Sequence, residues 1–232
     1  MLFLLPLTAC APQRQARTLE MTMSAAGVTA LLMKVNIGVL TITPSTDAKV
    51  HASVKLMPSN NYFWDLFTRS KSPEAIRAAA ISHELSNGTL GLSVQYPGNS
   101  DSDDVNEEWT VAIPASVRIN SHINIGKLQV SGIAGGVEAS LNVGKVSLDI
   151  PGGTLKITAN VGKIEARAPA LNYGDVTLNA DIGDVGLTVN GVPAGELQKG
   201  GTGSSLTYKG PGKDSINLLV NTGKVALTLS SN

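Results

Sequence analysis

The sequence is short of cysteine, histidine and aromatic residues, and it carries no excess of either charge. One cysteine and three histidines occur among 232 residues, and aromatic residues make up 4% of the chain. A single cysteine excludes an intrachain disulfide framework. The formal net charge is zero, so the chain lacks the excess positive charge that attracts nucleic-acid phosphates. We therefore expect no nucleic-acid partner.

Glycine and aliphatic residues are abundant instead. The chain has 24 glycines, and 42% of its residues are apolar, with valine, isoleucine, leucine and threonine spread along it in short runs. Such a chain is long enough and apolar enough to bury a core of its own. Short runs of β-branched residues separated by glycine are typical of many short strands joined by tight turns.

The single cysteine, Cys10, ends the apolar leader MLFLLPLTAC. Leu7-Thr8-Ala9-Cys10 resembles the lipobox of bacterial lipoproteins, in which a cysteine after small residues is lipidated and becomes the first mature residue. The leader is too short for a transmembrane helix. We predict a lipoprotein signal peptide over residues 1–10, lipidation at Cys10 and a polar tether over residues 11–27. An uncleaved leader with an incidental cysteine is the alternative.

The leader also bears on the location of the protein. No lysine or arginine precedes the short apolar run, so we expect the true start of the protein upstream. Pro12 stands at the second mature position, where an aspartate typically retains such lipoproteins in the inner membrane. The predicted location is the cell envelope, with the membrane as a partner through the lipid anchor. In a Gram-negative cell this means the outer membrane or the periplasm.

Glycines recur every nine residues in the second half of the chain. The phrase Gly-x-apolar-x-apolar begins at most members of one series, which comprises Gly126, Gly135, Gly144, Gly153 and Gly162, then Gly174 and Gly183 after a three-residue slip, and finally Gly223. Alternation of apolar and polar residues is the period of a strand with one buried face. Four or five residues of strand and a turn account for each nine-residue unit.

Units this short cannot bury their apolar face alone, so they need to stack on their neighbours. We predict an all-β fold, a single-stranded β-solenoid that resembles a β-helix, with two units in each coil of about 18 residues. Asn142-Val-Gly-Lys returns as Asn160-Val-Gly-Lys after 18 residues, so this phrase belongs to one corner of each coil, where glycine takes a positive φ. Asparagine or aspartate stands two residues before the glycine at Asn36, Asn124, Asn172, Asp181 and Asn221 as well. We expect the members in register to form a stacked polar ladder.

The first half of the chain is less regular. Residues 48–56 alternate like a strand, whereas residues 72–85 have helical spacing after a serine and a proline suited to a helix start. We therefore predict a short helical insertion near residues 60–85. The predicted division places the first rung, the strands and the insertion in residues 28–125 and the solenoid coils in residues 126–232, with 28–232 forming one domain. Residues 191–215 are expected to be a looser, irregular coil before closing strands at 216–220 and 224–229.

This order of parts resembles a bacterial family labelled putative adhesin, a β-solenoid domain of unknown function. The shared motifs are an early Gly-x-aliphatic-x-aliphatic rung, here Gly38 to Ile42, a Val-x-aliphatic-Pro strand, here Val111 to Pro114, and the glycine series from Gly126. The likeness covers roughly residues 28–230. It implies a solenoid on the cell envelope and carries no catalytic residues.

Three lysines follow corner glycines at eighteen-residue spacing: Lys127, Lys145 and Lys163. We expect them to stack at ~4.8 Å intervals, with Asp184 ending the row and Glu165 relieving the repulsion. As candidate ligand-binding residues they suit a polyanion such as lipopolysaccharide phosphate or an acidic glycan. The alternative is that they keep a strand wall soluble and prevent edge pairing.

Two further segments are candidate sites. Tyr62 and Trp64, in the stretch NYFWDLF, suit a sugar-stacking or partner-docking patch, or alternatively a cap over the open end of the solenoid. The acidic residues between 101 and 108 offer oxygens for calcium, but the stretch lacks the glycine and the spacing of an EF-hand loop. We predict no metal site and no cofactor.

Nothing in the sequence indicates catalysis. The histidines, His51, His83 and His122, have no triad-like or ligand-like spacing, and no nucleotide-binding or nucleophile motif occurs. Four carboxylates in the repeats are expected on different rungs and walls: Asp149, Glu165, Asp175 and Asp184. We predict a non-catalytic envelope lipoprotein that presents a rigid surface for adhesion or for binding a glycan or an envelope protein. A β-helix glycan-processing enzyme and a structural or assembly lipoprotein of the periplasm are the alternatives.

Overall fold

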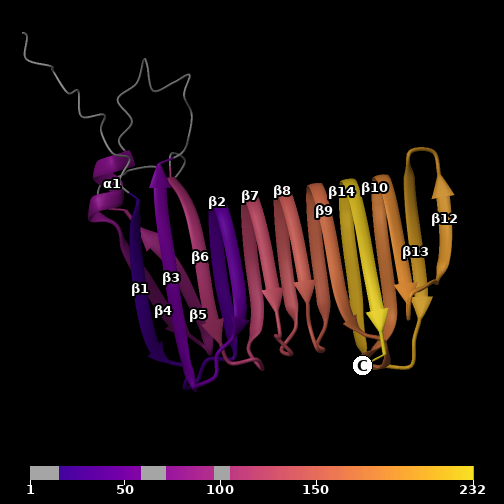
Figure 1. Ribbon diagram of the computed structural model, residues 1–232, viewed down its shortest axis with the longest axis horizontal. Helices are drawn as coiled ribbons and strands as arrows, with labels where there is room; N and C mark the ends of the chain where they lie inside the picture. The colour runs from indigo at the N-terminus through magenta and orange to yellow at the C-terminus, as the bar shows by residue number, and fades with distance from the viewer. Residues whose placement is uncertain (1–15, 59–71, 97–104, 232) are drawn as a thin grey trace, which may run out of the picture.

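The computed structural model describes residues 16–58, 72–96 and 105–231. These residues form one mixed sheet of fourteen strands, with one α-helix and one 3-10 turn beside it. The predicted all-β class is confirmed. The sheet has parallel strands in its middle and antiparallel strands at both ends, and it is not closed (Figure 1).

Six long strands form the central parallel block. In spatial order they are β2 (Ala30–Pro44), β7 (Arg118–Ser131), β8 (Val137–Asp149), β9 (Leu155–Pro169), β14 (Asp214–Ser230) and β10 (Tyr173–Val189). Gly126 lies beside Gly144, and Gly144 lies beside Gly162. The eighteen-residue repeat of the sequence is therefore the offset between neighbouring strands.

Each of these strands bends near its middle. In β8, Ala139 and Leu141 are buried before the bend, and Val146 and Leu148 are buried after it. The step from Leu141 to Val146 is odd, whereas a straight strand alternates with a period of two. Both halves of the strand therefore face one core, and Figure 1 shows the strands arching over at the upper edge. We call the half before the bend the first wall and the half after it the second wall.

Glycine is required at the bends for two reasons. The bend glycines stack strand on strand, and they are Gly38, Gly126, Gly144, Gly162, Gly223 and Gly183. Gly144 has a φ of 151°, a conformation that other residues rarely adopt. A Cβ atom there would lie 1.8 Å from the carbonyl oxygen of Gly126. The intervening members of the nine-residue series, Gly135 and Gly153, lie in the loops that join one strand to the next.

At the N-terminal end the two walls continue separately. The second wall is extended by β6 (Val105–Ile113), β3 (Lys49–Pro58) and β1 (Arg17–Ser24), and the first wall by β5 (Thr89–Gln95) and β4 (Ala80–Ser86). Strand β1 corrects the prediction of a tether over residues 11–27. Residues 17–24 pair with β3, and Leu19, Met21 and Met23 pack against the core. The alternation of these apolar residues places one face of the segment on the core.

The predicted helical insertion is shorter than expected. Helix α1 (Ser72–Ala78) is confirmed, but residues 80–86 form β4, which pairs with β5. The connection is Asn87-Gly88, and both residues have positive φ. Asn-Gly is a strong signal for a two-residue hairpin turn, and this turn overrides the helical spacing of Ile81 and Leu85.

The C-terminal end also differs from the prediction. Residues 191–215 do not form an irregular coil. They contain the short β11 (Val192–Pro193), β12 (Glu196–Gly200) and β13 (Gly203–Lys209), and the latter two pair as an antiparallel hairpin beside β10. The two closing strands predicted at 216–220 and 224–229 are one bent strand, β14. It lies between β9 and β10, so the spatial order of the repeats departs from their order in the chain.

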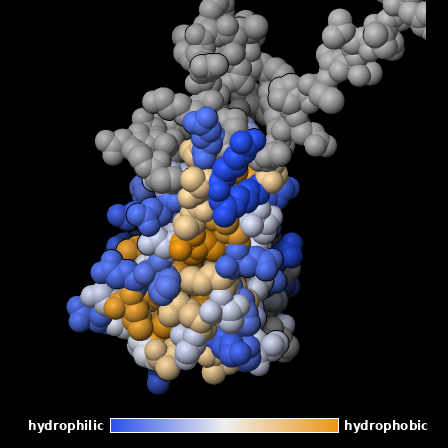
Figure 2. Space-filling view, turned by 90° about the vertical axis from the view of Figure 1, so that its left-hand side faces the viewer, coloured by the Kyte–Doolittle hydropathy of each residue, from blue (hydrophilic) through white to orange (hydrophobic). Residues whose placement is uncertain are grey.

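The predicted boundary at residue 126 falls inside β7, and one hydrophobic core runs through the whole described stack. Figure 2 views the end that carries β1 and β4, where apolar residues lie among hydrophilic ones. Among the residues that the structure describes, strands β1 and β4 each pair with a single neighbour. The aromatic residues predicted to cap this end, Tyr62 and Trp64, lie outside the described residues.

Candidate binding surface

The second wall carries the predicted lysines on its outer face. Lys127, Lys145 and Lys163 lie on neighbouring strands in register, as predicted. Lys224 of β14 extends the row, and Asp184 of β10 ends it. We call these five residues the lysine row. Lys224 was not among the predicted lysines, although it follows Gly223 in the same Gly-Lys phrase.

Glu165 partly neutralises the middle of the lysine row. Its carboxylate lies 2.5 Å from Nζ of Lys145 and also pairs with Lys163. Hydrogen bonds from Lys145 and then Lys163 lower the pKa of Glu165 to about 2. Lys127 and Lys224, on either side of this triad, form no ion pair within the described residues. The lysine row therefore has an ion-paired centre, with one ammonium group on each side that forms no ion pair with a described residue.

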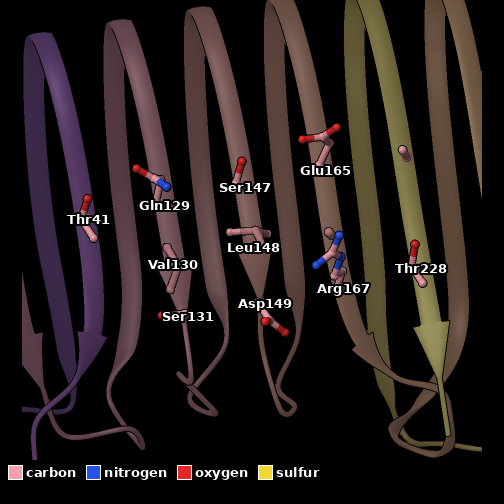
Figure 3. A pocket seen from close by; sticks show the side chains of 12 residues that line it. Thr41, Gln129, Val130, Ser131, Ser147, Leu148, Asp149, Glu165, Arg167 and Thr228 are labelled. Carbon is pink, nitrogen blue, oxygen red and sulfur yellow. The ribbon is translucent and has the colours of Figure 1, made fainter.

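A shallow groove of about 430 Å³ crosses the second wall below the lysine row (Figure 3). It runs over five strands, and its side chains offer hydroxyl, amide, carboxylate and guanidinium groups. They come from Thr41 of β2, Gln129 and Ser131 of β7, Ser147 and Asp149 of β8, Glu165 and Arg167 of β9, and Thr228 of β14. Such a lining, on a rigid sheet face, offers donors and acceptors to the hydroxyl groups of a sugar chain.

The placement of the repeat carboxylates was predicted wrongly in part. Asp149 and Glu165 lie on the same wall and line the same groove, because the eighteen-residue repeat puts both of them after a bend. Asp184 also follows a bend, in β10, whereas Asp175 precedes it and pairs with Lys209. Figure 3 shows Asp149 and Glu165 on neighbouring strands at different heights along the wall.

The predicted polar ladder runs along the bends. Each asparagine donates its side-chain N–H to the amide oxygen of the asparagine on the preceding strand, through Asn221, Asn160, Asn142, Asn124 and Asn36. The separation is 3.0 Å for Asn142 to Asn124. Asn172 is not a member, because it lies in the 3-10 turn Ala170–Asn172 and donates to the Pro151 carbonyl instead.

A buried carboxylate lies beside the first bend. Glu107 pairs with Gly38, and its side chain accepts hydrogen bonds from the Tyr96 hydroxyl at 2.9 Å and from Trp109 Nε1 at 2.7 Å. Burial raises the pKa of Glu107, and the two hydrogen bonds oppose this effect. Both oxygens are used, so the carboxylate serves to satisfy two buried donors.

The histidines do not come together. His51 pairs with Asp47 at 2.9 Å, and Nδ1 of His122 lies 2.7 Å from the Ser140 hydroxyl. No group of three or more potential metal ligands occurs in the described part of the chain. Among the same residues, no helix has the length and apolar character needed to cross a membrane. Cys10 lies outside the described residues, so its lipidation stays a prediction.

Comparison with known families finds no match for this sequence, and comparison with curated proteins finds none either. A solved structure of a putative cell adhesion protein from Clostridium sporogenes ATCC 15579 is similar in fold, with a TM-score of 0.56 and 18% identity over 94% of this chain and 100% of that one. The predicted resemblance to putative adhesins is thus confirmed at the level of the fold.

Two further solved structures align less well. A putative adhesin from Bacteroides fragilis NCTC 9343 has a TM-score of 0.28 and 12% identity over 94% of this chain and 99% of that one. A putative lipid binding protein from Parabacteroides distasonis ATCC 8503 has a TM-score of 0.26 and 10% identity over 94% of each chain. At TM-scores this low, the two alignments add no support for a shared fold.

Proposed function

We propose that this protein is a lipid-anchored protein of the cell envelope that binds an acidic glycan along its second wall and performs no catalysis. The similar fold from Clostridium sporogenes is described as a putative cell adhesion protein, and adhesion through a surface glycan is the role we propose here. The observation that carries the proposal is the polar groove beneath the lysine row. Parallel strands place its side chains in rows at ~4.8 Å steps, which suits an extended ligand lying across the strands.

A β-solenoid is the architecture that we propose for the parallel block. The support is the in-register pairing of strands 18 residues apart, the stacked bend glycines and the burial of both walls against one core. In such a coil every strand pairs with the next, so the wall is rigid along its length. A rigid wall binds an extended ligand without first having to order its own side chains and loops.

Arg167 and the two unpaired lysines give the groove its proposed preference for acidic sugars. Arg167 is exposed on the floor of the groove, where its guanidinium can bind a carboxylate through two hydrogen bonds. Lys127 and Lys224 stand at the rim, separated by two intervening strands. A carboxylated polysaccharide lying across the strands would meet the ammonium groups of Lys127 and Lys224 on the two sides of the ion-paired centre.

Binding to polygalacturonate, with neutral dextran as the comparison ligand, tests this proposal. Arg167→Gln should weaken polygalacturonate binding by about tenfold, the loss expected for one charge-assisted contact of about 1.5 kcal/mol. Arg118→Gln is the matched control, because Arg118 is an exposed arginine on the first wall of β7. If the two substitutions had equal effects, or if dextran bound as well as polygalacturonate, the groove would not be the binding site for an acidic glycan. A glycan array and a pull-down from envelope extracts would then separate another glycan from a fixed protein partner, the mark of an assembly lipoprotein.

The lipid anchor has its own test. Cys10→Ala removes the only thiol in the chain, so the protein should move from the membrane fraction to the soluble fraction of the cell. Ser116→Ala, at an exposed turn residue, is a control that should leave the distribution unchanged. If the Cys10→Ala protein stays in the membrane fraction, lipidation at this position is rejected.

A glycan-processing enzyme is the second candidate, because Asp149 and Glu165 line one groove. Glycoside hydrolysis needs one carboxylic acid that is protonated at working pH. Two lysines hold the pKa of Glu165 at about 2, so Glu165 is ionised and cannot donate that proton. Asp149 would then have to supply the acid, and binding is the function that we propose for the groove. Release of reducing ends from a bound glycan, abolished by Asp149→Asn, would reverse this assignment.

A further inference from the structure

The residue after the ladder position is aliphatic at every bend but one, and on three neighbouring strands it is about half exposed. Ile125, Val143 and Val161 follow the ladder asparagines, pair with one another in register, and are 46%, 44% and 48% exposed. We call these three residues the bend ridge. They lie on β7, β8 and β9, immediately before the bend glycines of these strands. An aligned row of half-exposed β-branched residues is an apolar strip on an otherwise polar edge.

The fold itself does not require the bend ridge to be apolar. On the next strand, β14, the same position holds Thr222, which pairs with Val161 in register. A β-branched residue suits the strand there, but a hydroxyl is tolerated as well as a methyl group. Exposed aliphatic side chains in a contiguous row therefore point to a contact with something outside the chain.

Positive charge lies along one side of the ridge. The lysine of each Gly-Lys phrase stands two residues after the ridge residue, so Lys127, Lys145 and Lys163 accompany it on the same three strands. Glu165 offsets one of these three charges, which leaves a net positive charge beside the ridge. Long lysine side chains extend their ammonium groups toward a polar boundary while their stems stay on apolar surface. Aliphatic residues with lysines beside them are the combination that binds the interface of an anionic bilayer.

The start of the described chain lies on the same edge. Arg17 pairs with Leu56, Leu56 with Glu107, and Glu107 with the bend glycine Gly38. Residue 16 therefore leaves the sheet at the level of the bends. Seven steps of chain separate Cys10 from Arg17, which span at most about 25 Å when fully extended. A lipid on Cys10 would hold this edge, rather than the loop edge, near the membrane.

We propose that the bend ridge and its lysines lie against the surface of an anionic phospholipid bilayer, with the stack of strands parallel to the membrane. The orientation rests on the proposed lipid anchor, whereas the surface chemistry does not. The contact ends before β10, where the ridge position Ile182 lies between Asp181 and Asp184. In this arrangement the second wall and its groove stand beside the membrane and stay open to a glycan.

Vesicle binding by the full chain carrying Cys10→Ala tests the surface without any lipid anchor. Co-sedimentation should be stronger with vesicles of phosphatidylcholine and phosphatidylglycerol than with phosphatidylcholine alone. The triple substitution Ile125→Thr, Val143→Thr and Val161→Thr should weaken binding to the anionic vesicles at least tenfold, since threonine already fills this position at 222. The matched control places threonine at three exposed aliphatic residues elsewhere, Leu171, Val192 and Leu197, and should change binding less than twofold.

The same Cys10→Ala background gives a direct measure of contact. Val143→Cys makes a sole cysteine for an environment-sensitive dye, which should shift to the blue with anionic vesicles, while the same dye at Leu171→Cys should not. Equal binding by the ridge variant and the control variant would overturn the proposal, as would an unshifted dye at position 143. Concentration-dependent dimerisation that is lost in the ridge variant, without vesicle binding, would assign the ridge to a second copy of the chain. Failure of the anchor test in cells would leave these vesicle results unaffected, so the two proposals fail separately.

Discussion

Replacing a bend glycine by alanine should be among the most damaging substitutions in the described stack. In Gly144→Ala the new methyl group would lie 1.8 Å from the Gly126 oxygen and 2.8 Å from its carbonyl carbon. Backbone atoms cannot rotate away, so β8 and β7 would have to separate at the bend. The φ of 151° adds backbone strain on the order of 1–3 kcal/mol.

The expected loss combines this strain with broken hydrogen bonds. Moving β8 away from β7 would lengthen about two ladder hydrogen bonds, each contributing about 1 kcal/mol to stability. Together with the strain, the free energy of unfolding should fall by about 3–5 kcal/mol. The measurement is urea unfolding followed by far-ultraviolet circular dichroism, comparing midpoints at similar slopes.

Gly186→Ala is the matched control for this experiment. Gly186 lies in the second wall of β10, nothing lies within 4 Å of a Cβ added there, and its partner on β14 is already an alanine, Ala226. Its substitution should change stability by less than about 1 kcal/mol, in either direction. If Gly144→Ala and Gly186→Ala were equally stable, the bend geometry and the stacking of glycines described above would be wrong.

Two further substitutions test the charged groups. Glu165 has a pKa lowered to about 2 from an ordinary value of 4.5, so its pairing stabilises the fold above pH 4.5 and is lost as the pH falls toward 2. The free energy of unfolding of the wild type should exceed that of Glu165→Gln by up to about 1 kcal/mol at pH 6, a small difference because the pair is exposed to solvent. Urea unfolding at a series of pH values should show this difference disappearing by about pH 2. Glu107→Gln should leave either the Tyr96 or the Trp109 donor without an acceptor, lowering stability by about 1–3 kcal/mol in thermal unfolding. A loss no larger than that of Glu108→Gln, its half-buried neighbour, would contradict the buried role.

Local sequence was sufficient to predict the bends. The Asn-x-Gly-Lys phrase contains both the residue that makes the ladder and the residue that allows strands to approach closely, so its repeat predicted the register of β7, β8 and β9. The same reasoning placed Lys127, Lys145 and Lys163 side by side. It also placed Glu165 near them, because a residue two positions after a lysine lies on the same face of a strand.

The ends of the sheet were harder to predict, because their strands depend on partners far away in the chain. Residues 17–24 alternate apolar and polar residues, but only pairing with β3 makes them a strand. Residues 80–86 carry both a helical spacing and a strand alternation, and the Asn87-Gly88 turn decides between them. The groove escaped prediction for the same reason, since it collects side chains from five strands whose order the sequence alone leaves open.

The asparagine ladder runs through β14 and stops before β10. Each member donates to the preceding strand and accepts from the next, which an amide can do and a carboxylate cannot. Asn221 of β14 continues the ladder by donating to Asn160, whereas Asp181 of β10, which accepts from Asn179, has no N–H to donate to Asn221, so the ladder stops at β14. Asn142→Asp should therefore cost about 1–2 kcal/mol, while Asp181→Asn should be neutral or slightly stabilising. Equal effects of the two substitutions on the urea midpoint would mean that the ladder hydrogen bonds do not stabilise the fold.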